Sequence, residues 1–343
     1  MTSREIVKRA IRFQNPPRVP YNYDSNRTPV TEHFYGDDFI WCFLDPLPGK
    51  AKFTAEESRE RNTRVDEWGT VWATLGDGSF GEAVQYAYEG LEEYADLPLP
   101  DFVNASRYET MKRIAQENKG EKYLLGMLPH ALFQCMIDIF GFEGFMLEVA
   151  GNEEEFVPFL DIMCDDCISV INRMADAGMD GIIIIEDMGL QDRLMISPVM
   201  WREIYMPRYK RMFDAAHSRG LDVISHTCGY IVEILDDYIA CGVDVIQLDQ
   251  QENMGLELLS ERFRGKVCFF CPADIQRTID MDREMLFARC DDMVRLLGTE
   301  HGGFMAKTYP QPEAVHITHE YMQNMTDGFK AASLKYYGGG ERK

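Results

Sequence analysis

The sequence predicts a single (β/α)8 barrel of the TIM type. From about residue 120 onward, short apolar segments alternate with longer segments of helical pattern. Near-continuous apolar strands separated by helices are typical of a parallel sheet that is covered on both faces. Polar and metal-binding residue types gather where the apolar segments end, which is where the functional groups of a barrel lie. A doubly wound sheet is the alternative, but the Gly-rich phosphate loop that usually follows its first strand is missing from this sequence.

The expected strands number eight. Two weaker candidates come first, at Arg18–Asn22 and Asp38–Cys42. Six clearer candidates follow, at Tyr123–Met127, Gly181–Glu186, Asp222–His226, Asp244–Asp249, Val267–Cys271 and Gly303–Lys307. Helical patterns such as Pro198–Arg219 and Met281–Leu297 lie between them. Eight such strand–helix units are the number that closes a TIM-type barrel.

The stretch from about residue 51 to residue 101 breaks this alternation. Within it, Val65–Trp72 has the pattern of a hairpin, and Gly76–Gly78 is typical of a turn. We expect this insertion to cap the mouth of the barrel. Residues 1–335 are therefore predicted to form one barrel domain, followed by a flexible Gly-rich tail over residues 336–343.

Composition limits the classes of partner. The chain carries 57 acidic and 35 basic residues and a formal charge of −22, which argues against a nucleic acid or an anionic membrane as partner. No apolar run reaches the length of a membrane span, and the first residues lack the apolar core of a signal peptide. The nine cysteines form no regular framework, so we expect free or metal-bound thiols in a reducing cytoplasm.

The segment Ser225–Gly229 is the best candidate for a metal site. If the preceding apolar residues form a strand, the side chains of His226 and Cys228 point to the same face. Imidazole and thiolate together suit zinc, which needs a third protein ligand. Cys271, at the end of a nearby strand, is the first candidate for that ligand, and Glu186 is the second. A core histidine packed beside a buried thiol is the alternative without a metal.

Other polar residues at strand ends are candidates for binding a substrate. Asp249 is expected to orient His226 or to contact the substrate, and His130 to line the mouth of the barrel. Two further cysteine pairs do not indicate a catalytic or redox site. Cys268 and Cys271 are expected on opposite faces of a strand, which argues against a redox pair there. Cys164–Cys167 has helical spacing, which favours packing in the core.

Several motifs resemble the uroporphyrinogen decarboxylase superfamily. The resemblance covers residues 2 to about 330, and its motifs occur in the same order as in the superfamily. His226–Gly229 resembles the HxCG element of the branch that transfers methyl groups from corrinoid proteins, and the chain is closer to that branch than to true uroporphyrinogen decarboxylase. The other matching segments are Thr2–Ala10, Pro16–Pro20, Ile196–Lys210, Asp66–Gly69 and Cys271–Gln276, the last two being similar to a bacterial decarboxylase-like group.

The resemblance implies a (β/α)8 barrel and a homodimer. Tetrapyrrole decarboxylases of this superfamily carry an Arg-rich segment early in the chain, whereas Asn22–Thr28 contains one arginine, so uroporphyrinogen is not the expected substrate. In the methyltransferase branch, zinc is held by the His and Cys of HxC and by a second Cys after the last strand. The corresponding segment Gly302–Pro310 contains no cysteine, so Cys271 or Glu186 would have to supply the third bond.

The expected function is methyl transfer between a corrinoid protein and a thiol or similar small nucleophile. Zinc would be the bound cofactor, and a separate protein would supply the methylated corrinoid to a small-molecule substrate. The expected catalytic residues are Glu186, Asp249 and Lys307, where Lys307 is predicted to pair with an anionic group of the substrate. The expected substrate-binding residues are Asp187, Gln250, Gln276, Tyr309 and His130.

Two other functions remain open at this point. The first is a metal-independent decarboxylase of a smaller acid, with Lys307 and Arg277 holding the anion. The second is a non-catalytic carrier of a tetrapyrrole or corrinoid. The chain lacks the Asp-x-His-x-x-Gly element of corrinoid-binding modules, which argues against cobalt being held in this chain.

Overall fold

Eight parallel strands form the core of the molecule and confirm the predicted barrel. The computed structural model describes residues 1–23, 26–27, 33–47, 62–73, 81–91, 99–309 and 317–338. Neighbours in the sheet follow the order of the chain from β4 to β13, and β1 pairs with β13. The strands are β1 (Tyr21–Asn22), β4 (Phe39–Cys42), β8 (Tyr123–Met127), β9 (Gly181–Ile185), β10 (Asp222–His226), β11 (Val245–Gln247), β12 (Cys268–Cys271) and β13 (Phe304–Lys307).

Asp38 closes the barrel between the first two of these strands. Its backbone N–H donates to the Tyr21 carbonyl at 3.1 Å, and its carboxylate accepts the N–H of Tyr21 at 2.7 Å. Arg18 holds the same carboxylate through two hydrogen bonds of 2.6 and 2.7 Å. A short hairpin that the sequence analysis missed, β2 (Asn26–Arg27) and β3 (His33–Tyr35), adds to β4 in antiparallel orientation.

Alternation along each strand produces two separate cores. Side chains on one face fill the barrel interior, and those on the other face pack under the surrounding helices. Burying each large apolar side chain contributes about 1.5–3 kcal/mol. The interior cluster includes Phe39, Leu125, Ile183, Ile224, Val245, Phe270 and Met305.

The first helix, α1 (Ser3–Ile11), closes the N-terminal end of the barrel. A capping box starts it, in which the Thr2 side chain accepts the N–H of Glu5 and the Glu5 carboxylate accepts the N–H of Thr2. Arg4 and Lys8 pair with Asp180, just before β9, at 2.7 and 3.0 Å. The apolar side of the helix contributes Val7, Ala10 and Ile11 to the interior cluster.

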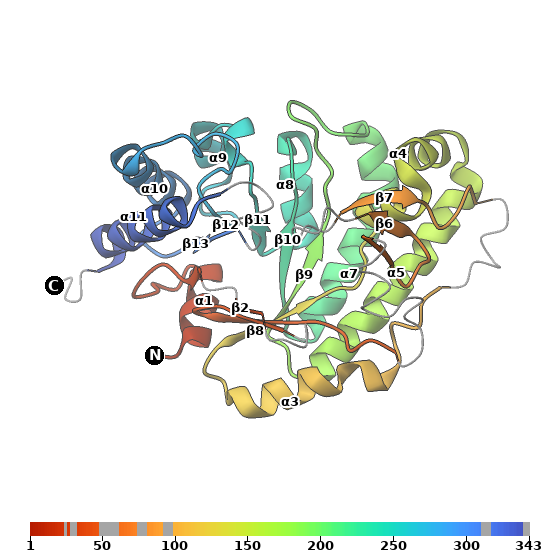
Figure 1. Cartoon of the computed structure of the whole chain (residues 1–343), viewed down its shortest axis with the longest axis horizontal. Helices are drawn as coiled ribbons and strands as arrows, with labels where there is room; N and C mark the ends of the chain where they lie inside the picture. The colour runs from red at the N-terminus through yellow and green to blue at the C-terminus, as the bar shows by residue number, and fades with distance from the viewer. Residues whose placement is uncertain are drawn as a thin grey trace.

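The remaining helices surround the sheet. Figure 1 shows α9, α10 and α11 on one side of the strands and α4 and α5 on the other, with both chain ends on the side of α11. The predicted helix Pro198–Arg219 is present, with a π-helical turn at Trp201–Tyr205 inside it. The helices are α3 (Glu109–Asn118), α4 (Gln134–Gly151), α5 (Glu153–Asp176), α6 (Pro198–Met200), α7 (Met206–Ser218), α8 (Val232–Cys241), α9 (Leu256–Phe263), α10 (Arg283–Leu297) and α11 (His319–Tyr337), with short 3-10 turns at Ala105–Tyr108 and Gln251–Asn253.

Helix α11 extends two residues into the segment that was predicted to be a tail. The end of that segment, residues 339–343, lies outside the described residues. Among the described residues, no helix is both long and apolar enough to cross a membrane. All nine cysteines are free thiols.

The insertion contains a three-stranded antiparallel sheet, so the predicted hairpin is confirmed and a third strand joins it. Its strands are β5 (Thr63–Val65), β6 (Val71–Ala73) and β7 (Glu82–Gln85), and the expected turn at residues 76–78 lies outside the described residues. Asp66 shapes the first turn, because its carboxylate accepts the backbone N–H groups of Trp68, Gly69 and Thr70 and the indole N–H of Trp72. Figure 1 shows β6 and β7 beside α4 and α5.

Candidate active site

A cavity of about 910 Å³ opens at the C-terminal ends of the strands. Strand-end residues of the barrel form its floor, and residues of the insertion, including Trp68 and Trp72, form part of its wall. The prediction that the insertion caps the mouth is therefore consistent with the cavity lining. This location is where barrel enzymes carry their functional groups.

Three side chains converge on the cavity floor with their donor atoms within 4.8 Å of one another: Asp187, His226 and Cys228. The His226 Nε2 atom lies 3.5 Å from the Cys228 Sγ atom and 3.5 Å from the Asp187 Oδ1 atom. Zn–N bonds of about 2.0–2.1 Å and Zn–S bonds of about 2.3 Å place neighbouring ligand atoms of a tetrahedral site roughly 3.5 Å apart. The donor set and its spacing thus fit a zinc ion with a fourth position open to the cavity.

A hydrogen-bond chain fixes the orientation of the His226 ring. The His226 Nδ1 atom is 2.6 Å from the Gln247 Oε1 atom, and the Gln247 amide nitrogen donates to Asp249 at 2.8 Å. Lys307 completes the chain by donating to the same Asp249 oxygen at 2.9 Å, in a pair whose side chains are only 5% and 7% exposed. Because an amide oxygen is an acceptor, Nδ1 carries the proton and Nε2 is left available for a metal.

Burial and mutual contacts shift the proton affinities of the three candidate ligands. Burial raises the pKa of Cys228, and the neighbouring His226 partly offsets that effect. Burial opposes protonation of His226, but hydrogen bonds with Asp187 and Cys228 outweigh it and raise the pKa of His226. For Asp187, burial is likewise outweighed, chiefly by the hydrogen bond with His226, and its pKa is lowered.

Gly229 allows the loops after β9 and β10 to touch each other. Its φ is +78°, and a Cβ atom there would lie 2.0 Å from the Gly189 carbonyl oxygen. Two backbone hydrogen bonds join the loops, from Gly189 N–H to Cys228 and from Tyr230 N–H to Leu190, at 3.3 and 2.7 Å. The glycine of the His-Thr-Cys-Gly motif therefore brings the loop of Asp187 against the loop of Cys228.

The structure corrects both predicted candidates for the third ligand. Cys271 points away from the barrel interior, into the layer under the helices, and is not among the residues that line the cavity. Glu186 also faces that layer, where its fully buried carboxylate accepts the backbone N–H groups of Leu132, Phe133 and Gln134 and the Tyr209 hydroxyl. Asp187, which was expected to bind the substrate, joins His226 and Cys228 instead.

Glu186 serves as a distant cap for helix α4. The three backbone N–H groups that it accepts lie at the N-terminus of that helix, which places a negative group at the positive end of the helix dipole. Burial raises the pKa of Glu186 to about 7, and its hydrogen bonds moderate the shift. These hydrogen bonds join α4 to the strand that precedes Asp187, and they place the Glu186 carboxylate outside the cavity lining.

The predicted substrate-binding residues divide into two groups. Gln250, Tyr309 and His130 line the cavity, and Gln250 also accepts the Gly229 N–H at 3.3 Å. His130 is held by Asp166 at 2.8 Å. Gln276 is exposed and does not line the cavity, because the loop after β12 turns its side chain outward.

The remaining predictions concern charged and sulfur groups. Lys307 lines the cavity and is paired with Asp249 at 2.9 Å, so that its predicted contact with an anionic group of the substrate stays a prediction. Cys268 faces the barrel interior and Cys271 the outer layer, which confirms their opposite orientation. Cys164 and Cys167 are buried in the core, as predicted from their helical spacing.

Two functional residues were missed by the sequence analysis. Gln247 lies two positions before Asp249 in the predicted strand Asp244–Asp249, so alternation places both on one face, a signal that was available in the sequence. Asp138 lines the cavity from α4, and nothing in the local sequence distinguishes it from a surface acid.

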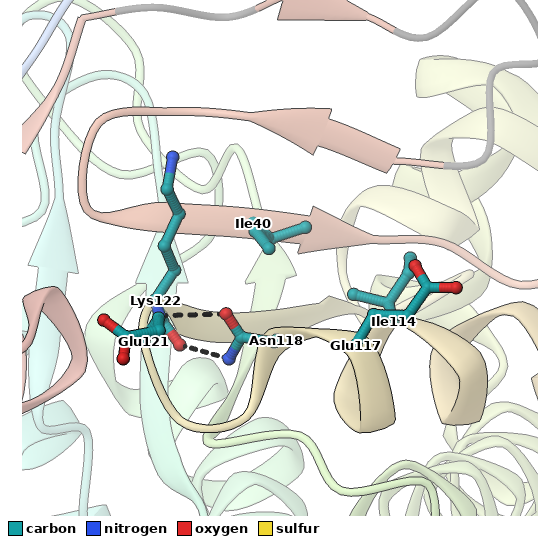
Figure 2. A pocket seen from close by; sticks show the side chains of 6 residues that line it. All are labelled: Ile40, Ile114, Glu117, Asn118, Glu121 and Lys122. Carbon is teal, nitrogen blue, oxygen red and sulfur yellow. Dashed lines mark hydrogen bonds between the residues drawn. The ribbon is translucent and has the colours of Figure 1, made fainter.

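A second, smaller pocket of about 280 Å³ lies between α3 and the segment that carries β4 (Figure 2). Two of its polar residues, Asn118 and Lys122, have partners within the chain. The Asn118 side chain clasps the backbone of Lys122 through hydrogen bonds of 2.8 and 2.9 Å, and the Lys122 ammonium donates to the Gly36 carbonyl at 2.6 Å. The pocket therefore reflects the turn that ends α3 rather than a binding site.

Comparisons with known proteins agree with this fold. A methyltransferase from Methanosarcina mazei has the same fold, with a TM-score of 0.65 and 14% identity over 98% of this chain and 99% of that one. The methylcobamide:CoM methyltransferase MtaA of Methanosarcina barkeri is 25% identical over 114 residues, which span 33% of this chain and 32% of that protein. The uroporphyrinogen decarboxylase (URO-D) family matches residues 81–270, more than half of the 343 residues. The chain belongs to the uroporphyrinogen decarboxylase (URO-D) family.

Proposed function

We propose that the protein is a zinc-dependent methyltransferase that moves a methyl group between a corrinoid protein and a thiol or similar small nucleophile. The observation that carries the proposal is the convergence of Asp187, His226 and Cys228 on the cavity floor at the spacing of zinc ligands. The similarity to the two Methanosarcina methyltransferases supports it.

Each residue of the site has a distinct role in this proposal. Asp187, His226 and Cys228 would hold zinc, and Gln247 would keep Nε2 of His226 turned toward it. Zinc bound there would lower the pKa of a thiol at the open position. Asp249 and Lys307 neutralise each other and anchor Gln247, so their contribution is to position the ligands.

The transfer balances without a further reactant. The thiol releases its proton to solvent, and the sulfur electron pair forms the new S–C bond. The Co–C bond of the methylated corrinoid breaks with its electron pair remaining on cobalt. The corrinoid would be presented by a separate protein at the mouth of the cavity, where the strand ends of the barrel open.

The decarboxylase alternative gains no support from the site. It needs cations that are free to hold the carboxylate of a small acid. Lys307 is neutralised by Asp249, and Arg277 is exposed and outside the cavity lining. Neither of these two residues therefore offers an unpaired positive charge in the cavity to an anionic substrate.

Zinc content and methyl transfer test the proposal together. Protein purified without chelator is expected to contain about one zinc per chain, as the three-ligand catalytic class does. It should also move the methyl group of methylcob(III)alamin to a thiol. His226→Ala and Asp187→Ala should lose zinc and activity, whereas Cys271→Ala, the matched control in the outer layer, should keep both. Full activity of His226→Ala in metal-free buffer would contradict the proposal.

A further inference from the structure

The cavity beyond the metal ligands is lined by aromatic side chains. They come from β4 and the residue that follows it, from the insertion, from the segment before α3 and from the residues after β13. Some rings are held in place by one another, since Trp68 packs 5.8 Å from Phe102 and 5.6 Å from His130 between ring centres. The aromatic lining consists of Trp41, Phe43, Trp68, Trp72, Phe102 and Tyr309.

The charged groups of the cavity leave an excess of negative charge. Among the described residues, the lining contains five carboxylates and two basic side chains other than histidine, Arg64 and Lys307. Lys307 forms an ion pair with Asp249. Glu67 forms an ion pair with Arg107, with one hydrogen bond of 2.7 Å between their side chains. If Asp187 binds the proposed metal, Asp66 and Asp138 are left with Arg64 as the other described cation of the lining.

Among the described residues, the Asp138 carboxylate has one side-chain hydrogen bond, to a neutral amide, and the nearby charge of Arg64 offsets only part of the effect of its burial. Its side chain accepts the Gln134 amide at 2.8 Å, whereas Asp66 is satisfied by four N–H donors in its turn. Burial raises the pKa of Asp138 to about 6, and the carboxylates of Asp66 and Asp187 add to that effect. A positively charged ligand group beside Asp138 would stabilise its ionised form and lower its pKa.

The aromatic wall already accommodates one cation. The Arg64 guanidinium lies over the Trp72 ring, 4.7 Å from its centre. Aromatic faces attract ammonium groups through the ring quadrupole, and quaternary ammonium ligands are recognised by cages of such rings. Charge and aromatic lining are independent observations, and both favour the same class of ligand.

We propose that the substrate of this cavity carries a cationic ammonium group, held between Asp138 and the aromatic rings, while its reacting atom lies at the metal ligands. The inference rests on the proposed function, which places the reacting atom of the substrate at the metal ligands. It narrows the substrate of that function to a small nucleophile that also carries an amine or quaternary ammonium group, and it excludes a small anionic thiol.

Three matched probes test the ligand class on the zinc-loaded protein. Choline is the cation, 3,3-dimethylbutan-1-ol is its neutral counterpart of the same shape, and 2-mercaptoethanesulfonate is an anionic thiol. Titration calorimetry should show choline binding about tenfold or more tightly than the neutral alcohol, as cation–π and charge pairing predict. Equal binding of choline and the alcohol, or tighter binding of the anionic probe to the aromatic region, would overturn the inference.

Two variants on the same helix locate the effect. Asp138→Asn should remove most of the preference for choline over the alcohol, while Glu143→Gln, an exposed change of equal charge on α4, should keep it. A preference that survives in Asp138→Asn would also overturn the assignment. The anionic probe can reach zinc through its thiol, so its binding is repeated with His226→Ala.

Failure of this inference is distinguishable from failure of the proposed function. If the protein binds zinc and transfers methyl groups but does not prefer choline, the substrate class is wrong and the function stands. If the protein prefers choline through Asp138 but contains no zinc, the ligand class stands and the metal-dependent function is wrong.

Discussion

Gln247 is the residue on which the geometry of the metal ligands depends. Its amide can donate only from nitrogen, and Asp249 can only accept, so the amide oxygen must face Nδ1 of His226. Asp249 in turn is fixed by Lys307. The buried Lys307–Asp249 pair therefore fixes the orientation of the Gln247 amide, and that amide fixes the orientation of the imidazole that would bind zinc.

Replacing Gln247 by Leu should weaken zinc binding without unfolding the protein. Loss of the partner that orients a histidine ligand typically costs about 10–100-fold in metal affinity. Competition with a chromophoric chelator measures that affinity. Gln276→Leu, an exposed change outside the cavity lining, serves as the control. Equal losses in both variants would show that Gln247 has no special role.

Asp138 should make stability depend on pH in a defined direction. Burial raises its pKa to about 6 in the folded protein, against about 3.9 in the unfolded chain. The folded state therefore holds this proton more tightly. The contribution of Asp138 to the free energy of unfolding is fully present below about pH 4 and is lost as pH rises through about 6.

Urea denaturation between pH 4 and pH 8 measures this effect by comparison with Asp138→Asn. The wild-type protein should lose about 1–2 kcal/mol relative to the variant over that range, after allowance for solvent screening of a partly exposed group. A constant difference between the two proteins across the range would contradict the raised pKa.

At the residue scale, the spacing of His226 and Cys228 predicted that their side chains lie together, but it did not predict which third residue lies beside them. Side chains of β9 alternate, so Ile183 and Ile185 face the interior and Asp187 follows them, while Glu186 faces the helices. The same alternation turns Cys271 outward. Strands that are apolar on both faces do not reveal which face is the interior, and this is why the sequence did not distinguish Asp187 from Glu186 as the neighbour of His226.

Among the elements, α4 depends on a contact that is remote in sequence. The N-terminal N–H groups of most helices are capped by a nearby side chain, whereas α4 is capped by Glu186, 52 residues away from Gln134. This link positions the helix that carries Asp138 against the strand that leads to Asp187. Such caps are invisible to local sequence patterns.

Replacing Glu186 by Ala should destabilise the protein strongly. It leaves three backbone N–H groups and the Tyr209 hydroxyl without their acceptor, at a cost of about 3–5 kcal/mol. Chemical denaturation measures the loss. Glu186→Gln keeps an acceptor oxygen and should lose less, and zinc binding by that variant should persist because the carboxylate is not a ligand. Complete loss of zinc in a folded Glu186→Gln protein would restore Glu186 as a candidate ligand.

The elements that sequence analysis predicted least well are the short ones. β2 and β3 contain two and three residues, too few to show an alternating pattern. β7 joins the insertion sheet from a separate segment. The strand–helix units of the barrel, by contrast, could be predicted, because a long segment of helical pattern separates each apolar strand from the next.

For the whole molecule, the order of the strands could be predicted but the closure of the barrel could not. Right-handed βαβ connections place consecutive parallel strands beside each other, which gives the observed order from β4 to β13. The junction of β1 and β4 instead depends on the buried carboxylate of Asp38 and its bonds to Tyr21 and Arg18.

Replacing Asp38 by Ala should therefore destabilise the barrel as a whole. The change removes a buried partner of Arg18 and an acceptor for the Tyr21 N–H, at a cost of about 3–5 kcal/mol. Asp37→Ala, an exposed neighbour, should cost much less. Thermal unfolding compares the two, and similar melting temperatures would show that the junction does not depend on this carboxylate.

The central claim is that Asp187, and not Cys271 or Glu186, completes the metal site. Anomalous X-ray scattering recorded at the zinc edge on crystals of the full chain tests it most directly. We predict one anomalous peak within bonding distance of Asp187, His226 and Cys228, with its open side toward the cavity. No peak between His226 and Cys228, or a peak bonded to Cys271 or Glu186, would contradict the account.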